Sequence, residues 1–223
     1  MGMWSDVKWL FFDVGDTLVD EWIPVDHIMN QFVERAADRG YSITIQDVRE
    51  KFIESYSNFI DSPMQYAISQ LIEKEEDKAY IRPRLKFRKE LETPYPEAKK
   101  ILAQLGEYYR IGVIANQSPG TAERLHQYGF SSYVDVIACS AEQGLAKPDV
   151  RLYEYALQKA GCAPSEAVMI GDRIDNDIVP AKLLGMKTIR ILQGYGRYQP
   201  STGAGDTPDC TISSLDELIA LLL

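Results

Sequence analysis

The strongest constraint on the fold is a repeated pairing of a short apolar run with a longer stretch that carries helix start and stop signals. The first apolar run, residues 7–12, ends at Asp13, and Gly15 and Asp16 mark a turn directly after it. Further runs of strand length lie at 111–115, 134–138, 167–170 and 187–192. Strands that alternate with helices in this way predict a mostly parallel sheet covered by helices on both faces.

Residues 21–93 break this alternation, because they hold several amphipathic helices and no convincing strand. The Thr93–Pro96 segment contains two X-Pro bonds and is a stiff point of return to the sheet. We therefore expect an α/β fold in which residues 1–20 and 94–223 form a doubly wound, Rossmann-like parallel sheet with an inserted all-helical domain. Ligands bind at the carboxyl ends of the strands in such sheets, so the insertion is expected to act as a cap domain.

Charge, cysteine content and hydropathy exclude several classes of function. The net charge of -9 argues against nucleic acid or an anionic membrane as the main partner. Three widely spaced cysteines and two histidines offer no zinc-ligand pattern and no disulfide framework. We also expect no signal peptide, and the sequence contains no apolar run long enough to span a bilayer. We expect a cytoplasmic protein that acts as a monomer or homodimer, with no nucleic-acid and no membrane partner.

Polar side chains stand where the predicted strands end. Asp13 follows the first strand and Asn116 the second, while Lys147 comes after the third. Asp172 follows the fourth strand, with Asp177 close behind. Each of these alone is explained as a turn residue, a helix cap or a solvated charge. Together they converge at one edge of a parallel sheet, where clustered carboxylates repel one another unless a cation such as Mg²⁺ binds between them.

These residues resemble the four motifs of the haloacid dehalogenase (HAD) superfamily. The segment Asp13-Val-Gly-Asp-Thr-Leu resembles the first motif, and Ile-Ala-Asn116 the second. Ala-Lys147-Pro-Asp resembles the third, and Gly-Asp172-Arg-Ile-Asp-Asn-Asp177 the fourth. The motifs follow in the family's order, and the helical insertion lies where its C1-type caps lie. The tail from Pro208 resembles the family's closing strand and helix, so the likeness spans nearly the whole chain.

The resemblance implies a Mg²⁺-dependent hydrolase in which Asp13 is the nucleophile. Its carboxylate would attack phosphorus and form an aspartyl-phosphate, which water then hydrolyses. Asp13, Asp172 and the backbone carbonyl of Gly15 would hold the metal, and Asp177 would support it through water. The substrate is expected to be a small phosphorylated molecule.

The same resemblance assigns roles to three further residues. Lys147 would neutralise charge on the transferring group and reduce the repulsion around the nucleophile. Thr17 would hold the nucleophile loop in place. Asn116 would lie beside the incoming group.

Two positions depart from the pattern of the family's phosphatases. These enzymes place an aspartate two residues after the nucleophile, where it protonates the leaving oxygen. Here that position is Gly15, and the carboxylate falls one residue later at Asp16. The second motif normally offers a hydroxyl where this chain has Ala115. Because a lost general acid typically costs about 10²–10⁴-fold in rate, we expect a preference for substrates with good leaving groups.

Three alternatives to a phosphatase stay open. A dehalogenase also lacks the second aspartate, but it works without metal and does not keep a pair such as Gly171-Asp172. A phosphonatase keeps the metal and has a small residue at the Gly15 position. It also needs a cap lysine, for which Lys51 is a loose candidate. The third alternative is a catalytically weak relative that binds a phosphorylated ligand or protein, which both Gly15 and Ala115 favour.

The stretch 193–208 is rich in Gly, Pro and Ser and is predicted to be a long surface loop. It contains Gly194-Tyr195-Gly196, which lacks the rest of a dinucleotide-binding fingerprint and does not join a strand to a helix. We therefore assign no cofactor site to it.

Overall fold

A computed structural model of the protein describes residues 2–223. The chain divides into two compact units. The first comprises the chain up to Asp20, Thr93–Arg197 and Ser201–Leu223. The second comprises Glu21–Glu92 and the short segment Tyr198–Pro200. The sheet lies in the first unit and the inserted helices form the second.

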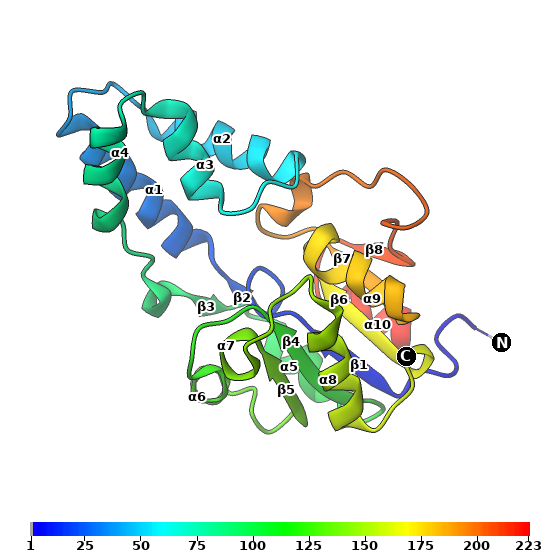
Figure 1. Ribbon diagram of the computed structural model, residues 1–223. Helices are drawn as coiled ribbons and strands as arrows, with labels where there is room; N and C mark the ends of the chain where they lie inside the picture. Colours follow the sequence, from blue (N-terminus) through cyan, green and yellow to red (C-terminus); the bar gives the residue numbers. More distant parts are fainter. Residues whose placement is uncertain (1) are drawn as a thin grey trace. The chain divides into compact units, whose positions relative to one another are not determined.

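The six strands of the first unit run parallel in the order β5-β4-β1-β6-β7-β8 (Figure 1). Their bounds are β1 Trp9–Phe12, β4 Arg110–Ala115, β5 Val136–Cys139, β6 Ala167–Gly171, β7 Lys187–Ile191 and β8 Cys210–Ile212. Central β1 pairs with β4 on one side and β6 on the other, so that Leu10 is in register with Ile111 and Val168. The chain therefore winds outward from the centre in both directions, which confirms the predicted doubly wound α/β fold.

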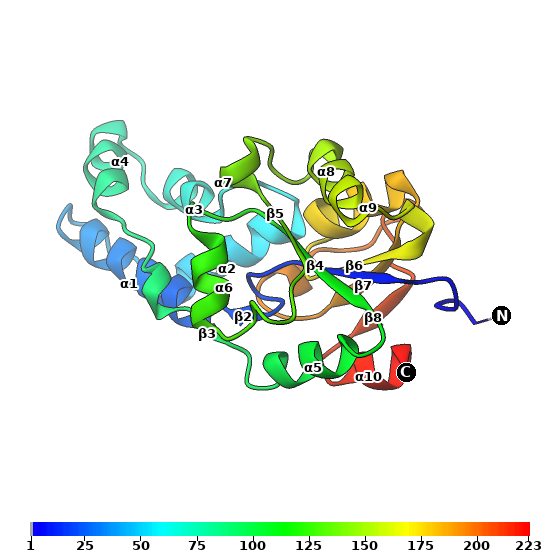
Figure 2. The same ribbon diagram turned by 90° about the horizontal axis from the view of Figure 1, so that it is seen from below.

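Helices cover both faces of this sheet, as Figure 2 shows. They are α5 Ala98–Leu105, α6 Thr121–Gln127, α7 Ser140–Gln143, α8 Val150–Ala160, α9 Val179–Leu184 and α10 Glu217–Leu222, with the short turns η3 Pro164–Glu166, η4 Ile174–Ile178 and η5 Gly196–Tyr198. Leu10 and Phe12 share an apolar cluster with α5 and α10, whereas Phe11 shares one with α8 and α9. Because both faces are buried, the central strands β1 and β6 are continuous apolar runs, whereas β7 also contains the buried polar residues Thr188 and Arg190.

Over residues 21–92 the second unit contains helices joined by loops and no strand. Its helices are α1 Trp22–Ala37, α2 Ile45–Ser57, α3 Pro63–Leu71 and α4 Glu75–Ile81, followed by the turns η1 Arg82–Arg84 and η2 Lys89–Leu91. α2 packs against α1 and α3, and α1 also packs against α4. A capping box starts α2, since Thr44 Oγ1 accepts a hydrogen bond from the Asp47 N–H and the Asp47 carboxylate accepts one from the Thr44 N–H.

A two-stranded antiparallel pair flanks the helical stretch in the sequence. β2 Val19–Asp20 precedes the helices and β3 Thr93–Pro94 follows them. The action of the helical unit as a cap remains a prediction. Across residues 2–223, no helix combines the length and the apolar character needed to cross a membrane.

The prediction of a surface loop at 193–208 is wrong for its first part. Gln193, Tyr195 and Gln199 are 8%, 7% and 2% exposed, whereas residues 201–205 are exposed as expected. The buried part contains Gly194 and Gly196. The backbone of each glycine packs closely against an acidic side chain, Asp16 for Gly194 and Asp172 for Gly196. Composition alone did not reveal this burial, because glycine is equally common in open loops and at close backbone contacts.

Candidate active site

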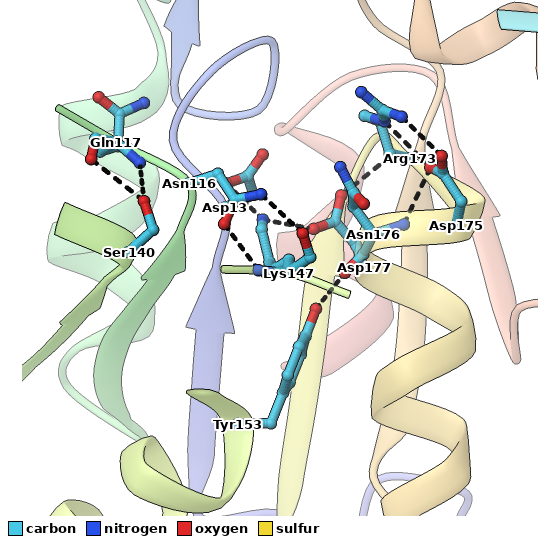
Figure 3. A network of polar contacts seen from close by, with 10 residues as sticks. All are labelled: Asp13, Asn116, Gln117, Ser140, Lys147, Tyr153, Arg173, Asp175, Asn176 and Asp177. Carbon is cyan, nitrogen blue, oxygen red and sulfur yellow. Dashed lines mark hydrogen bonds and ion pairs between the residues drawn. The ribbon is translucent and has the colours of Figure 1, made fainter. Parts of the chain in front are cut away.

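The carboxyl ends of the central strands bring the predicted residues to one edge of the sheet (Figure 3). Asp13 directly follows β1, Asn116 follows β4 and Asp172 follows β6. The Asp13 N–H donates to the Ile170 carbonyl over 2.9 Å, which extends the pairing of β1 and β6 by one residue. The position of Asp13 is therefore fixed by the sheet itself.

Lys147 lies between two of these carboxylates. Its Nζ is 2.7 Å from Asp13 Oδ1 and 2.6 Å from Asp177 Oδ1, and its side chain is 2% exposed. Burial lowers the pKa of Lys147, but Asp13 and Asp177 outweigh this and raise that pKa above its ordinary value. The raised pKa favours the charged ammonium form of Lys147, which faces the Asp13 carboxylate.

Three carboxylates meet at this point. One oxygen from each of Asp13, Asp172 and Asp177 lies within 4.8 Å of the others. Burial raises the pKa of Asp177 to about 6, although Lys147 lowers it. Burial, followed by the negative charges of Asp177, Asp16 and Asp13, raises the pKa of Asp172 well above its usual range. Within the described residues, the ion pairs of this cluster are those of Lys147 with Asp13 and Asp177, while outside the cluster Asp16 raises and Arg173 lowers the pKa of Asp172. Such a set of oxygen donors fits a hard cation such as Mg²⁺.

Asn116 holds the loop that carries Lys147. Its Nδ2 donates to the Lys147 carbonyl over 2.9 Å, and its Oδ1 accepts from the Lys147 N–H over 2.7 Å. Both groups of the amide are therefore bonded to the backbone of one residue. In this arrangement Asn116 positions the lysine at the sheet edge.

The segment after β6 fixes Asp177. The Arg173 N–H donates to Asp177 Oδ2 over 3.0 Å, and the buried Tyr153 hydroxyl donates to the Asn176 carbonyl. A Cβ atom at Gly171 would lie 2.4 Å from Asp177 Cγ, which is closer than Cβ atoms approach in real structures. Only glycine therefore lets this carboxylate pack on the end of β6.

The loop after Asp13 contains the remaining predicted residues. Gly15 offers no side chain, and Asp16 has a φ of 49°. The Asp16 N–H donates to the Val19 carbonyl over 2.7 Å. Its carboxylate lies against Gly194 and is not part of the three-carboxylate cluster. Thr17 Oγ1 is buried and makes no hydrogen bond within the described chain, so its assigned role stays a prediction.

The second-motif position is the fully buried Ala115, which has no hydroxyl to offer. A hydroxyl does lie on the neighbouring strand end, where Ser140 follows β5. Ser140 Oγ accepts from the Gln117 N–H over 3.0 Å and lies 3.2 Å from the Gln117 carbonyl, to which it donates. Ser140 therefore orders the loop after β4.

Sequence reasoning missed two features that touch Asp172. Arg190 lies inside β7 and is 6% exposed, and it donates from Nε to the Asp172 carbonyl over 3.3 Å. Gly196 packs directly on the Asp172 carboxylate. The available signal was an arginine between the apolar residues Ile189 and Ile191 of a predicted strand, because an arginine is rarely buried without a partner.

The sequence and the fold both resemble those of known proteins. Residues 7–185 match the family model described as haloacid dehalogenase-like hydrolase. A glyceraldehyde 3-phosphate phosphatase of Methanocaldococcus jannaschii is 29% identical over 97% of this chain and 97% of its own length. The pyrimidine 5'-nucleotidase YjjG of Escherichia coli is 36% identical over 60% of this chain and 58% of its own. A solved structure described as a predicted phosphoglycolate phosphatase from Haemophilus somnus shares the fold, with a TM-score of 0.74 at 18% identity over 98% of this chain and 99% of that chain.

Proposed function

The chain belongs to the haloacid dehalogenase-like hydrolases, and from this premise we propose that it is a Mg²⁺-dependent phosphatase of small phosphorylated metabolites. The observation that carries the proposal is the buried Lys147 ammonium, which contacts Asp13 within a cluster of three carboxylates. Relatives whose names describe phosphatases and a nucleotidase support hydrolysis at phosphorus.

Asp13 is the proposed nucleophile. One of its oxygens forms a bond to phosphorus while the bond from phosphorus to the leaving oxygen breaks, and the electron pair departs with that oxygen. Water then attacks the phosphorus of the aspartyl-phosphate, which releases phosphate and restores the carboxylate. Lys147, 2.7 Å from Asp13 Oδ1, offsets negative charge on the transferring group.

The proposed cofactor is Mg²⁺. Asp13, Asp172 and the Gly15 carbonyl would hold it, with Asp177 supporting them. The support for this assignment is that one carboxylate oxygen from each of Asp13, Asp172 and Asp177 lies within 4.8 Å of the others. When bound, Mg²⁺ supplies positive charge that stabilises the phosphoryl oxygens.

The proposed substrates carry good leaving groups. No carboxylate stands at the Gly15 position, and the neighbouring Asp16 packs against Gly194 instead of joining the three-carboxylate cluster. An alkoxide leaving group therefore has no carboxylic acid at that position to protonate it, whereas an acyl or aryl oxygen departs without such help.

A direct test compares hydrolysis of acetyl phosphate, p-nitrophenyl phosphate and glycerol phosphate with and without Mg²⁺. We expect Mg²⁺-dependent turnover of the first two and turnover of glycerol phosphate lower by about 10²-fold or more. The Gly15→Asp variant should raise glycerol phosphate turnover relative to p-nitrophenyl phosphate. Equal turnover of all three by the wild type would refute the leaving-group preference.

Phosphonate cleavage is less well supported than phosphate hydrolysis. Lys51, the candidate for the required amine, pairs with Glu54 over 2.7 Å. The hydrogen bond to Glu54 raises the pKa of Lys51, and a charged ammonium does not attack a carbonyl group. Turnover of phosphonoacetaldehyde that is lost in Lys51→Met would reverse this preference. No turnover of any phosphate or phosphonate would favour a relative that only binds a phosphorylated ligand or protein.

A further inference from the structure

Residues 193–197, which we call the glycine turn, pack against the acidic site. A Cβ atom at Gly196 would lie 2.1 Å from Asp172 Oδ2 and 2.8 Å from its Cγ. Real Cβ atoms essentially never approach other heavy atoms within 3.0 Å. The φ angle of Gly196 is not in the left-handed region, so its backbone conformation accepts any residue. Contact with Asp172 is therefore what restricts this position to glycine.

Arg190 joins the glycine turn to the same aspartate. It donates from Nε to the Asp172 carbonyl over 3.3 Å and from a terminal nitrogen to the Gly196 carbonyl over 2.8 Å. Both bonds are buried, and they start from a side chain anchored in β7. A rigid strand thus sets the separation between the backbone of Asp172 and the turn that covers its carboxylate.

The other end of the glycine turn contacts the loop that follows the nucleophile. With its amide nitrogen facing this loop, Gln193 donates to the carbonyls of Asp16 and Thr17 over 3.2 and 3.3 Å. Gly194 has a φ of +50°, and a Cβ atom there would lie 1.9 Å from Asp16 Oδ2. The same short segment therefore holds both chain segments that contribute proposed metal ligands.

We infer that the glycine turn is a wall of the metal site and that Gly196 and Arg190 are positioning residues for the Asp172 carboxylate. This inference rests on the proposed function, because it concerns the residue that would hold Mg²⁺. A methyl group at position 196 has to displace the carboxylate or the turn. Changes in groups that orient metal ligands typically weaken metal affinity by about 10–100-fold, and we expect Gly196→Ala to fall in that range.

The test is Mg²⁺ titration by calorimetry of the wild type, Gly196→Ala and the control Gly203→Ala. Gly203 lies further along the same stretch, and a Cβ atom there would meet nothing within 4 Å. Gly203→Ala should bind Mg²⁺ with wild-type affinity, and Gly196→Ala about 10–100-fold more weakly. Excess Mg²⁺ should restore turnover of p-nitrophenyl phosphate by Gly196→Ala, which a general structural defect would not allow.

A second variant covers the case in which Gly196→Ala does not fold. Arg190→Lys keeps the positive charge but loses the forked bridge, so we expect Mg²⁺ affinity to fall by about 10-fold. If the wild type binds Mg²⁺ and the folded Gly196→Ala or Arg190→Lys binds it equally well, the positioning role is wrong and the proposed function stands. A wild-type protein that binds no Mg²⁺ overturns both.

Discussion

Each unit of the protein contains a cluster of opposite charges around a buried aspartate, and the two clusters differ in the ratio of cations to carboxylates. In the helical unit, Arg39 Nε lies 2.5 Å from Asp77 Oδ1, and the Tyr41 hydroxyl donates to Asp77 Oδ2 over 3.0 Å. One cation therefore meets one carboxylate, and both carboxylate oxygens have donors. In the sheet unit, one ammonium, that of Lys147, faces a cluster of three carboxylates.

The pKa shifts follow this difference. The hydrogen bond from Arg39 lowers the pKa of Asp77. Burial raises the pKa of Asp177 to about 6 and that of Asp172 well above its usual range. In the Arg39–Asp77 pair each charge has a partner, so the pair needs no further ligand and its role is to stabilise the fold. An unbalanced cluster is unfavourable without a further cation, and such groups concentrate at functional sites.

The largest expected effect is a loss of enzymatic activity on mutation of the sheet-unit cluster but not of the helical-unit cluster. Asp13→Asn removes the proposed nucleophile, so Mg²⁺-dependent hydrolysis of p-nitrophenyl phosphate should fall by about 10⁴-fold or more. Asp77→Asn, the same chemical change in the balanced cluster, should keep turnover within a few-fold at temperatures where it is folded. Steady-state kinetics on both variants checks this, and full activity in Asp13→Asn would remove that residue from the mechanism.

The next effect concerns stability without metal, where the two clusters should respond with opposite signs. Asp172→Asn relieves repulsion among buried carboxylates and should raise the unfolding temperature in EDTA by about 2–6 °C. Asp77→Asn leaves Arg39 with a neutral partner and should lower the unfolding temperature by a few degrees. Differential scanning calorimetry measures both. Loss of stability in Asp172→Asn would show that the acidic cluster is not under electrostatic strain.

The balanced cluster also predicts a dependence on pH. The folded-state pKa of Asp77 is lowered, below the unfolded value of about 3.9. Between these two values the unfolded state binds more protons, so the stability that Asp77 contributes is present above about pH 4 and is lost as pH falls through the folded pKa. The difference in unfolding temperature between wild type and Asp77→Asn should therefore shrink between pH 6 and pH 3. A difference that stays constant over this range would contradict the assigned pKa shift.

The smallest effect is expected at an exposed pair that belongs to neither cluster. Arg110 and Asp135 lie 2.9 Å apart, with side chains 71% and 36% exposed. Water screens this pair, so Arg110→Met should change the free energy of unfolding by less than about 0.5 kcal/mol. Urea denaturation provides the measurement. A larger loss would mean that exposure is a poor guide to the importance of ion pairs in this protein.

The sheet and the main site residues were predictable from sequence because both depend on local signals. Apolar runs mark the strands, and parallel strands bring their carboxyl ends to one edge. Asp13, Asn116 and Asp172 each follow a strand directly, so their convergence follows from the fold class. The contact of Lys147 with Asp13 depends on the loop after β5, and the four-motif resemblance placed Lys147 near Asp13. The contact of Lys147 with Asp177 was not predicted.

The glycine turn was not predictable in the same way. Gly196 lies 24 positions after Asp172 in the sequence. It can pack on the Asp172 carboxylate only because glycine has no Cβ atom. The position of the Asp16 carboxylate was equally hidden, because it depends on a left-handed backbone and on the packing of Gly194. Close packing between segments that are distant in the sequence leaves no periodic pattern in it. Composition alone therefore assigns Gly194 and Gly196 to a surface loop.

The most direct test of the account is calorimetric titration of Mg²⁺ into the wild type, Asp172→Asn and Asp77→Asn under identical conditions. We expect one bound Mg²⁺ per chain in the wild type and in Asp77→Asn, and no measurable binding in Asp172→Asn. Equal binding by wild type and Asp172→Asn, or no binding by the wild type, would contradict the claim that the unbalanced cluster is a metal site.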